Sequence, residues 1–177
     1  DMNSLAHSNQ EQDLRRVLST CLDPLLQHCR DSAASLGRLE GMVYMVNCLH
    51  IVHNTVALYE FTESHLEVLD SQVRGNLDVI ARELSLQLMH MAGIAEFFDK
   101  HMHSQVSAED FQTLLGGSAE GLTNLIALPE HQQVAQCGLI ASATLRAEVK
   151  QATVEQFVTA YQTVYNFVTG ELGQSDA

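Results

Sequence analysis

The chain has 177 residues, enough to bury a core without metal ions or disulfide bonds, and its 46% of apolar residues exclude a disordered tail. Its 9 Lys and Arg residues stand against 22 Asp and Glu residues, and the resulting net charge of −13 excludes binding to a nucleic-acid backbone and argues against direct binding to an anionic membrane. With only 2 prolines in the whole chain, the composition favours long helices.

The first helices are predicted from apolar residues spaced by three and four. The first helix is expected to end before Asp23, which would cap a second helix that begins at Pro24. That second helix runs to about Leu36, and Gly37 is expected to stop it.

A third helix is predicted from Leu39 to about Tyr59, with a heptad seam of apolar residues. The segment from Gly41 to Tyr59 has no charged residue and is almost long enough to cross a membrane. Polar residues are spread around this helix, and burying them in lipid without partners would be costly. We therefore expect it to lie inside a helical bundle, without direct membrane insertion. These polar residues are Asn47, His50, His53, Asn54 and Thr55.

A fourth helix is expected from a cap at Thr62 to about His101, because its apolar residues keep the α-helical period. Beside its apolar stripe, residues of alternating charge recur every four positions, which indicates a solvated flank. This ladder consists of Asp70, Arg74, Asp78 and Arg82.

The pattern weakens over residues 104–138, where we expect a long, partly ordered connecting region. Ser107 and Asp110 could form a capping box for a short helix through Leu115. Gly116 and Gly117 are expected to break this helix, and a second short helix would span Ala119–Leu128.

The last helix is expected to begin near Ser142 and to end at Gly170 and Gly173. Its apolar stripe is predicted to face the core. Together these elements predict an all-α fold, an elongated antiparallel bundle of roughly five to seven helices. We expect one domain over residues 1–177, as a fragment of a longer chain. The stripe consists of Val154, Phe157, Val158, Tyr161, Val164, Tyr165 and Val168.

Candidate chemistry is sparse. His50 and His53 share a helix face, and His101 and His103 lie near a helix end, but a zinc site needs three or four convergent ligands. The four cysteines form no C-x-x-C motif, so we expect them reduced and buried. Gly116-Gly117-Ser118 lacks the Walker lysine and is only a weak phosphate-loop candidate. We expect no catalytic residue, no metal ion and no cofactor, and therefore no enzyme.

A partner surface is predicted on the last helix, because no charged residue occurs between Glu155 and Glu171. Uncharged polar side chains around an aromatic residue are typical of protein interfaces. Either this surface docks a neighbouring protein, or Phe167 folds against the middle segment of the chain itself. The predicted surface consists of Gln156, Thr159, Thr163, Asn166 and Phe167.

The order of several short sequence segments resembles the C-terminal region of subunit six of the conserved oligomeric Golgi complex. The resemblance is close over residues 18–81 and fair over residues 139–168. Between them Gly116-Gly117 and Cys137-Gly138 depart from the family pattern, so nothing is carried over there. The segments include Leu22-Asp23-Pro24-Leu25-Leu26-Gln27, Met45-Val46-Asn47, Glu60-Phe61-Thr62, Ser142-Ala143-Thr144-Leu145 and Val164-Tyr165.

The resemblance implies an exocyst-type tether subunit built from consecutive helical bundles. It implies a structural and interaction module of a multisubunit vesicle tether in intra-Golgi retrograde transport, held peripherally on the cytosolic face of the Golgi apparatus. The implied partners are the other subunits of the complex, SNAREs, Rab GTPases and coiled-coil tethers. One alternative is a helical adaptor that binds SNARE or other amphipathic helices directly, outside a tethering complex. Another alternative is a helical di-metal protein.

Overall fold

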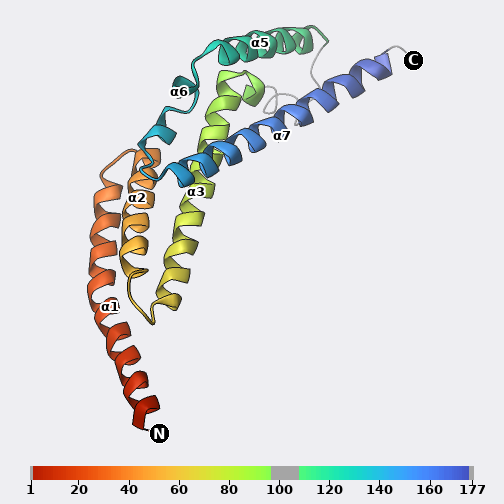
Figure 1. Cartoon of the computed structure of the whole chain (residues 1–177). Coiled ribbons are helices and arrows are strands. Elements are labelled where there is room, and N and C mark those ends of the chain that lie inside the picture. The colour runs from red at the N-terminus through yellow and green to blue at the C-terminus, as the bar shows by residue number, and fades with distance from the viewer. Residues whose placement is uncertain (1, 97–107, 176–177) are drawn as a thin grey trace. The chain divides into compact units, whose positions relative to one another are not determined.

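The computed structural model describes residues 2–96 and 108–175, and within them every element is a helix, which confirms the all-α class (Figure 1). The chain divides into two compact units: unit 1 comprises residues 1–78 and 140–143, and unit 2 comprises residues 79–139 and 144–177. The single domain over residues 1–177 stays a prediction. The helices are α1 (Met2–Ala34), α2 (Arg38–Val56), α3 (Glu63–Met91), α5 (Ala108–Ala127), α6 (Glu130–Gln133), the 3-10 helix η1 (Ala135–Leu139) and α7 (Ala143–Ser175).

In unit 1, α1, α2 and the first half of α3 run side by side in alternating directions (Figure 1). α2 is the charge-poor helix that we expected to be buried, and Val46 and Leu49 are both 0% exposed. α1 packs closely on α2, because a Cβ atom on Gly41 would lie 2.6 Å from the carbonyl oxygen of Ala33. Only glycine allows this approach of the two backbones.

α1 corrects the predicted boundary at Asp23 and Pro24, because one helix continues through both residues. Proline in a helix interior removes one backbone hydrogen bond, here to the carbonyl of Thr20. Thr20 and Pro24 are both exposed, so water can satisfy that carbonyl. On the other side of α1, Leu26 and Cys29 are buried, and this packing holds the helix together.

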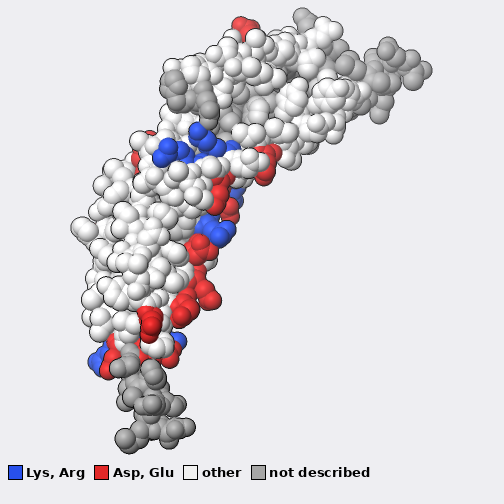
Figure 2. All heavy atoms as spheres, viewed as in Figure 1, with Lys and Arg blue, Asp and Glu red and all other residues white. Residues whose placement is uncertain are grey.

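The start of α3 agrees with the sequence. Thr62 directly precedes the helix, and its carbonyl accepts hydrogen bonds from the backbone N–H groups of His65 at 2.9 Å and Leu66 at 3.0 Å. On the flank that we expected to be solvated, Arg74 forms an ion pair with Asp70 at 2.8 Å. Acidic side chains, with arginines among them, gather along the α3 edge of unit 1 (Figure 2).

In unit 2, α3 ends at Met91 instead of continuing to His101. Gly93 adopts a φ of 69°, a left-handed conformation that ends helices. A Cβ atom on Gly121 would lie 2.7 Å from the carbonyl carbon of Ala92, so α5 approaches this chain reversal closely. Residues of this chain reversal belong to a hydrophobic cluster of buried residues. The cluster consists of Leu88, Ala92, Ile94, Leu125, Val164 and Val168.

Two further helix boundaries are corrected in unit 2. α5 runs without a break through Gly116 and Gly117, because Leu115, Leu122 and Leu125 pack on the hydrophobic cluster and outweigh the poor helix propensity of glycine. α7 begins at Ala143, close to the predicted Ser142, but it continues past Gly170 and Gly173 to Ser175. In the described part of the chain, no helix combines the length and the apolar character that a membrane span requires.

Candidate interaction surface

The glycine-rich segment cannot act as a phosphate loop. Gly116, Gly117 and Ser118 lie inside α5, where the backbone N–H groups are used by the helix itself. The hydroxyl group of Ser118 donates a hydrogen bond to the carbonyl of Gly93 at 3.1 Å and so has a packing role.

A local hydrogen bond explains His50 better than a metal ion does. The Nε2 atom of His50 is 3.2 Å from Nδ2 of Asn54, one helical turn further along α2. Over the described ranges, no three His, Cys, Asp or Glu side chains converge on a possible metal position. His101 and His103 lie outside the described residues.

Of the four cysteines, Cys29 and Cys137 are buried as predicted, Cys48 is half-buried, and Cys21 is exposed, so the prediction is wrong for Cys21. Burial raises the pKa of Cys29, and a hydrogen bond with Cys48 on α2 raises it further. Burial also raises the pKa of Cys137. A thiol with a raised pKa has a smaller thiolate fraction at neutral pH, so these residues contribute to packing rather than to catalysis.

One face of α7 carries an exposed apolar stripe, here called the α7 stripe. It consists of Val154, Val158, Tyr161 and Tyr165, which are spaced by four, three and four residues and are 53%, 53%, 38% and 52% exposed. This spacing places all four side chains on one side of the helix. An exposed row of large apolar residues on a helix indicates a surface that a partner covers.

The α7 stripe corrects the prediction that these residues face the core. Of the predicted stripe, only Val164 and Val168 are buried, and Phe157 is half-buried. α7 has apolar residues on two adjoining sides, and helical periodicity alone does not decide which side faces inward.

The residues of the predicted partner surface are divided between two sides of α7. Thr159, Thr163 and Asn166 are exposed, but the helical turn of α7 directs them away from the α7 stripe, and Thr163 lies on nearly the opposite side of the helix. Gln156 and Phe167 are half-buried, and Phe167 packs against the hydrophobic cluster of unit 2. Whether any of these residues binds a partner stays a prediction.

Several exposed polar groups of α7 are hydrogen-bonded within the helix. The hydroxyl of Thr159 donates to the carbonyl of Glu155 at 2.8 Å, and the hydroxyl of Thr163 donates to the carbonyl of Thr159 at 2.9 Å. The side-chain amide of Gln162 donates to Oδ1 of Asn166 at 2.9 Å. A partner that covered these polar side chains would leave none of these donors unpaired, which keeps the desolvation cost low.

A hollow of about 240 Å³ adjoins the α7 stripe within unit 2. Its wall is almost entirely apolar, and Tyr161 and Tyr165 belong both to this wall and to the α7 stripe. The hollow is large enough for a bulky side chain of a partner, the usual anchor of a protein interface. The other wall residues include Ile94, Leu115, Leu122, Val164 and Val168.

Comparison with known proteins gives the family. The family described as "Conserved Oligomeric Golgi complex subunit 6, C-terminal" matches residues 1–176. The chain belongs to this family. The family covers the middle of the chain as well, where the sequence alone gave no resemblance between residues 81 and 139.

Individual relatives agree with the family. Human conserved oligomeric Golgi complex subunit 6 is 28% identical over 93% of this chain and 26% of its own length. The subunit 6 of Drosophila melanogaster is 28% identical over 90% of this chain and 25% of its own length. The chain thus spans about a quarter of the length of these relatives. No solved structure matches it.

Proposed function

We propose that this chain is the C-terminal interaction module of a subunit 6 of the conserved oligomeric Golgi complex and that it works by protein–protein contacts. In this proposal it is held peripherally on the cytosolic face of the Golgi apparatus and takes part in vesicle tethering during intra-Golgi retrograde transport. The family match over residues 1–176 supports the assignment to the complex.

The α7 stripe carries the proposal that this module docks a sister subunit. Its four apolar side chains form one exposed row on a segment of α7 that has no charged residue between Glu155 and Glu171. This composition, with aromatic residues present and charges absent, is that of an interface core. We propose separately that a partner also contacts the predicted residues on the other sides of α7, which are Gln156, Thr159, Thr163, Asn166 and Phe167.

The test is co-purification of sister subunits with the full-length protein that contains this chain. Val158→Glu places a charge in the middle of the α7 stripe, and we expect it to reduce the bound sister subunits by roughly tenfold or more, as for a buried interface residue. Ile51→Glu is the matched control, because Ile51 on α2 is 63% exposed and lies outside the α7 stripe. Both variants should keep the helical circular dichroism of the parent.

The result is read from mass spectrometry of the purified complex. Parental amounts of every sister subunit with Val158→Glu would show that the α7 stripe is not the docking surface. Purification of SNARE helices without any sister subunit would favour the adaptor outside a tethering complex. SNAREs, Rab GTPases and coiled-coil tethers are further proposed partners, which the same purification would detect.

A further inference from the structure

Two cysteines on neighbouring helices of unit 1 lie in contact with each other. Cys29 on α1 is 7% exposed, and Cys48 on α2 is half-buried. The thiol of Cys29 donates a hydrogen bond to the sulfur of Cys48, so the two side chains meet between the helices. We call these two residues the α1–α2 cysteine pair. The other two cysteines lie apart from it, since Cys21 is exposed on α1 and Cys137 belongs to unit 2.

The packing of α1 on α2 explains this contact. The two helices run in opposite directions (Figure 1), and their backbones approach each other at Ala33 and Gly41. Cys29 lies one turn before Ala33 on α1, and Cys48 lies about two turns after Gly41 on α2. Side chains of a helix lean toward its N-terminus, so in an antiparallel pair these two side chains lean toward each other. The contact therefore follows from the register of the two helices.

Hydrogen bonds also hold Cys48 from its own helix. The hydroxyl of Tyr44, one turn earlier on α2, donates to the sulfur of Cys48, and the hydroxyl of Ser32 on α1 donates to the oxygen of Tyr44. Tyr44 and Cys48 are both half-buried, whereas Cys29 is buried. Cys48 is therefore the sulfur of the pair that a small molecule reaches more easily from water.

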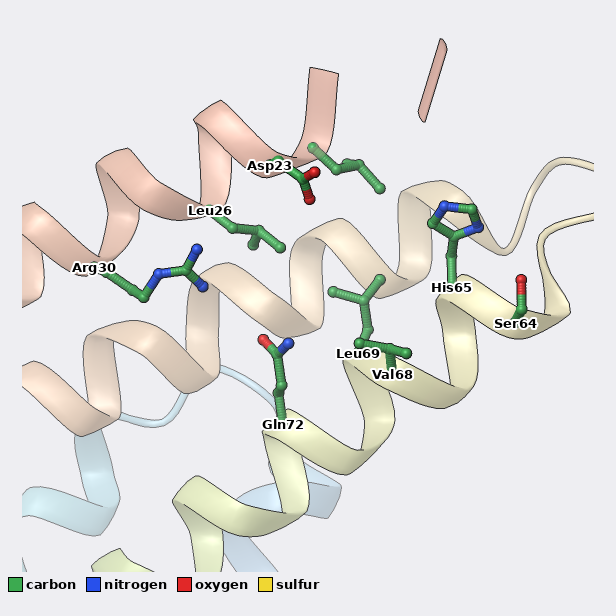
Figure 3. A pocket seen from close by; sticks show the side chains of 9 residues that line it. Asp23, Leu26, Arg30, Ser64, His65, Val68, Leu69 and Gln72 are labelled. Carbon is green, nitrogen blue, oxygen red and sulfur yellow. The ribbon is translucent and has the colours of Figure 1, made fainter. Parts of the chain in front are cut away.

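A different side of α1 faces α3. Leu26 and Arg30 line a hollow of about 350 Å³ between these two helices (Figure 3). Neither residue of the α1–α2 cysteine pair lines this hollow. A bond between Cys29 and Cys48 would therefore join α1 to α2 and leave the hollow as it is.

We propose that the α1–α2 cysteine pair is an oxidation site, at which hydrogen peroxide forms a disulfide bond between Cys29 and Cys48. In the first step the sulfur of Cys48 attacks one oxygen of the peroxide, the O–O bond breaks, and a sulfenic acid and a water molecule form. In the second step the sulfur of Cys29 attacks the sulfur of Cys48 and the S–O bond breaks. The hydroxyl group leaves with the proton of the Cys29 thiol as a second water molecule.

This reaction is balanced, because both sulfurs are oxidised and both oxygens of the peroxide are reduced. A small thiol such as glutathione reverses it by thiol–disulfide exchange. The disulfide bond would close a loop over residues 29–48, and constraining the unfolded chain in this way stabilises the folded state. Peroxide would thus hold α1 on α2. This inference does not rest on the α7 stripe or on the proposed function.

The test uses the full-length protein that contains this chain, treated with hydrogen peroxide and then alkylated in urea to block the remaining thiols. Cleavage after arginine places Cys29 in the peptide of residues 17–30 and Cys48 in the peptide of residues 39–74. We expect mass spectrometry to find these two peptides joined by a bond that a reducing thiol breaks. Cys137, which is 0% exposed, should be found alkylated.

Three variants assign the bond to its residues. Cys21→Ser is the matched control, because Cys21 is in the same peptide as Cys29, and it should leave the joined peptides unchanged. Cys48→Ser should abolish the bond and leave Cys29 as a thiol at the same dose of peroxide. Cys29→Ser should leave Cys48 as a sulfenic acid, which dimedone traps.

Thermal unfolding of the isolated chain measures the effect of the bond. We expect the melting temperature of the oxidised chain to exceed that of the reduced chain by roughly 5–10 °C, as for a disulfide bond that closes a loop of this length. Equal melting temperatures would contradict the proposal that the bond holds α1 on α2.

Two results with the peptides would overturn the proposal. The first is a parent protein in which a dose of peroxide that oxidises the exposed Cys21 leaves the two peptides separate. This result is measured without any variant, so it does not depend on how the variants fold. The second is a bond that persists with Cys29→Ser or is lost with Cys21→Ser, because Cys21 would then be the partner of Cys48. Neither result affects the co-purification of sister subunits with Val158→Glu.

Discussion

α2 and the second half of α7 share a sequence property but differ in their surroundings. α2 has no charged residue after Glu40, and α7 has none between Glu155 and Glu171. In α2, Leu49 is 0% exposed, whereas in α7 Val158 is 53% exposed. The absence of charge therefore does not distinguish a helix buried in its own bundle from a helix whose face is available to a partner.

The difference follows from how many sides of each helix are covered. The buried residues of α2 lie on several sides of the helix. They include Gly41, Val43, Val46 and Leu49. α7 buries one side, with Val149, Thr153 and Val164, and leaves the adjoining apolar side open. A charge-free face that its own chain does not cover is a candidate interface.

The largest expected effect is on stability in α2. Leu49→Ala should lower the free energy of unfolding by about 2–5 kcal/mol, because it removes methyl groups from a fully buried site and leaves a cavity. Tyr161→Ala in α7 should cost less than about 1 kcal/mol, since its side chain is partly in water. Urea unfolding measures both, and equal losses would contradict the assignment of α2 to the core and the α7 stripe to the surface.

Phe167→Asp tests the side of α7 that faces the hydrophobic cluster. Phe167 is half-buried against this cluster, so we expect the aspartate to lower the free energy of unfolding by about 1–3 kcal/mol. The melting temperature of the variant, compared with that of the parent, measures this loss. An unchanged melting temperature together with loss of sister subunits would instead assign Phe167 to the docking surface.

Two glycine substitutions test how closely each region is packed. Gly41→Ala should destabilise the chain by about 1–3 kcal/mol, because the new methyl group would collide with the carbonyl of Ala33. Gly116→Ala in α5 has no atom within 4 Å of the new methyl group and should stabilise the chain by about 0.5–1 kcal/mol. If both changes have the same sign in urea unfolding, the close contact between α1 and α2 is wrong.

The sequence predicts some of these features better than others. Most of the seam predicted in α2 is buried, with Met45, Leu49, Val52 and Val56, but Tyr59 lies after the end of the helix and is 58% exposed. Pro24 and Gly116 led to wrong predicted helix boundaries. Their cost in helix propensity, about 1–3 kcal/mol, is smaller than the free energy that a long helix gains by packing on its neighbours. The inward side of α7 was misassigned, because two apolar stripes compete for the core.

The candidate sites were predicted only in part. The absence of charge pointed to α7, which carries the exposed α7 stripe, but the predicted residues Thr159, Thr163 and Asn166 are exposed on other sides of the helix and their role stays a prediction.

The most direct test of the central claim is hydroxyl-radical footprinting of the tyrosines, in the isolated chain and in the assembled complex. Tyr165 on the α7 stripe and Tyr59 after α2 are 52% and 58% exposed, so both should be oxidised readily in the isolated chain. In the complex we expect oxidation of Tyr161 and Tyr165 to fall strongly while that of Tyr59 stays the same. Equal oxidation of Tyr165 in the isolated chain and in the complex would contradict the proposal that a sister subunit covers the α7 stripe.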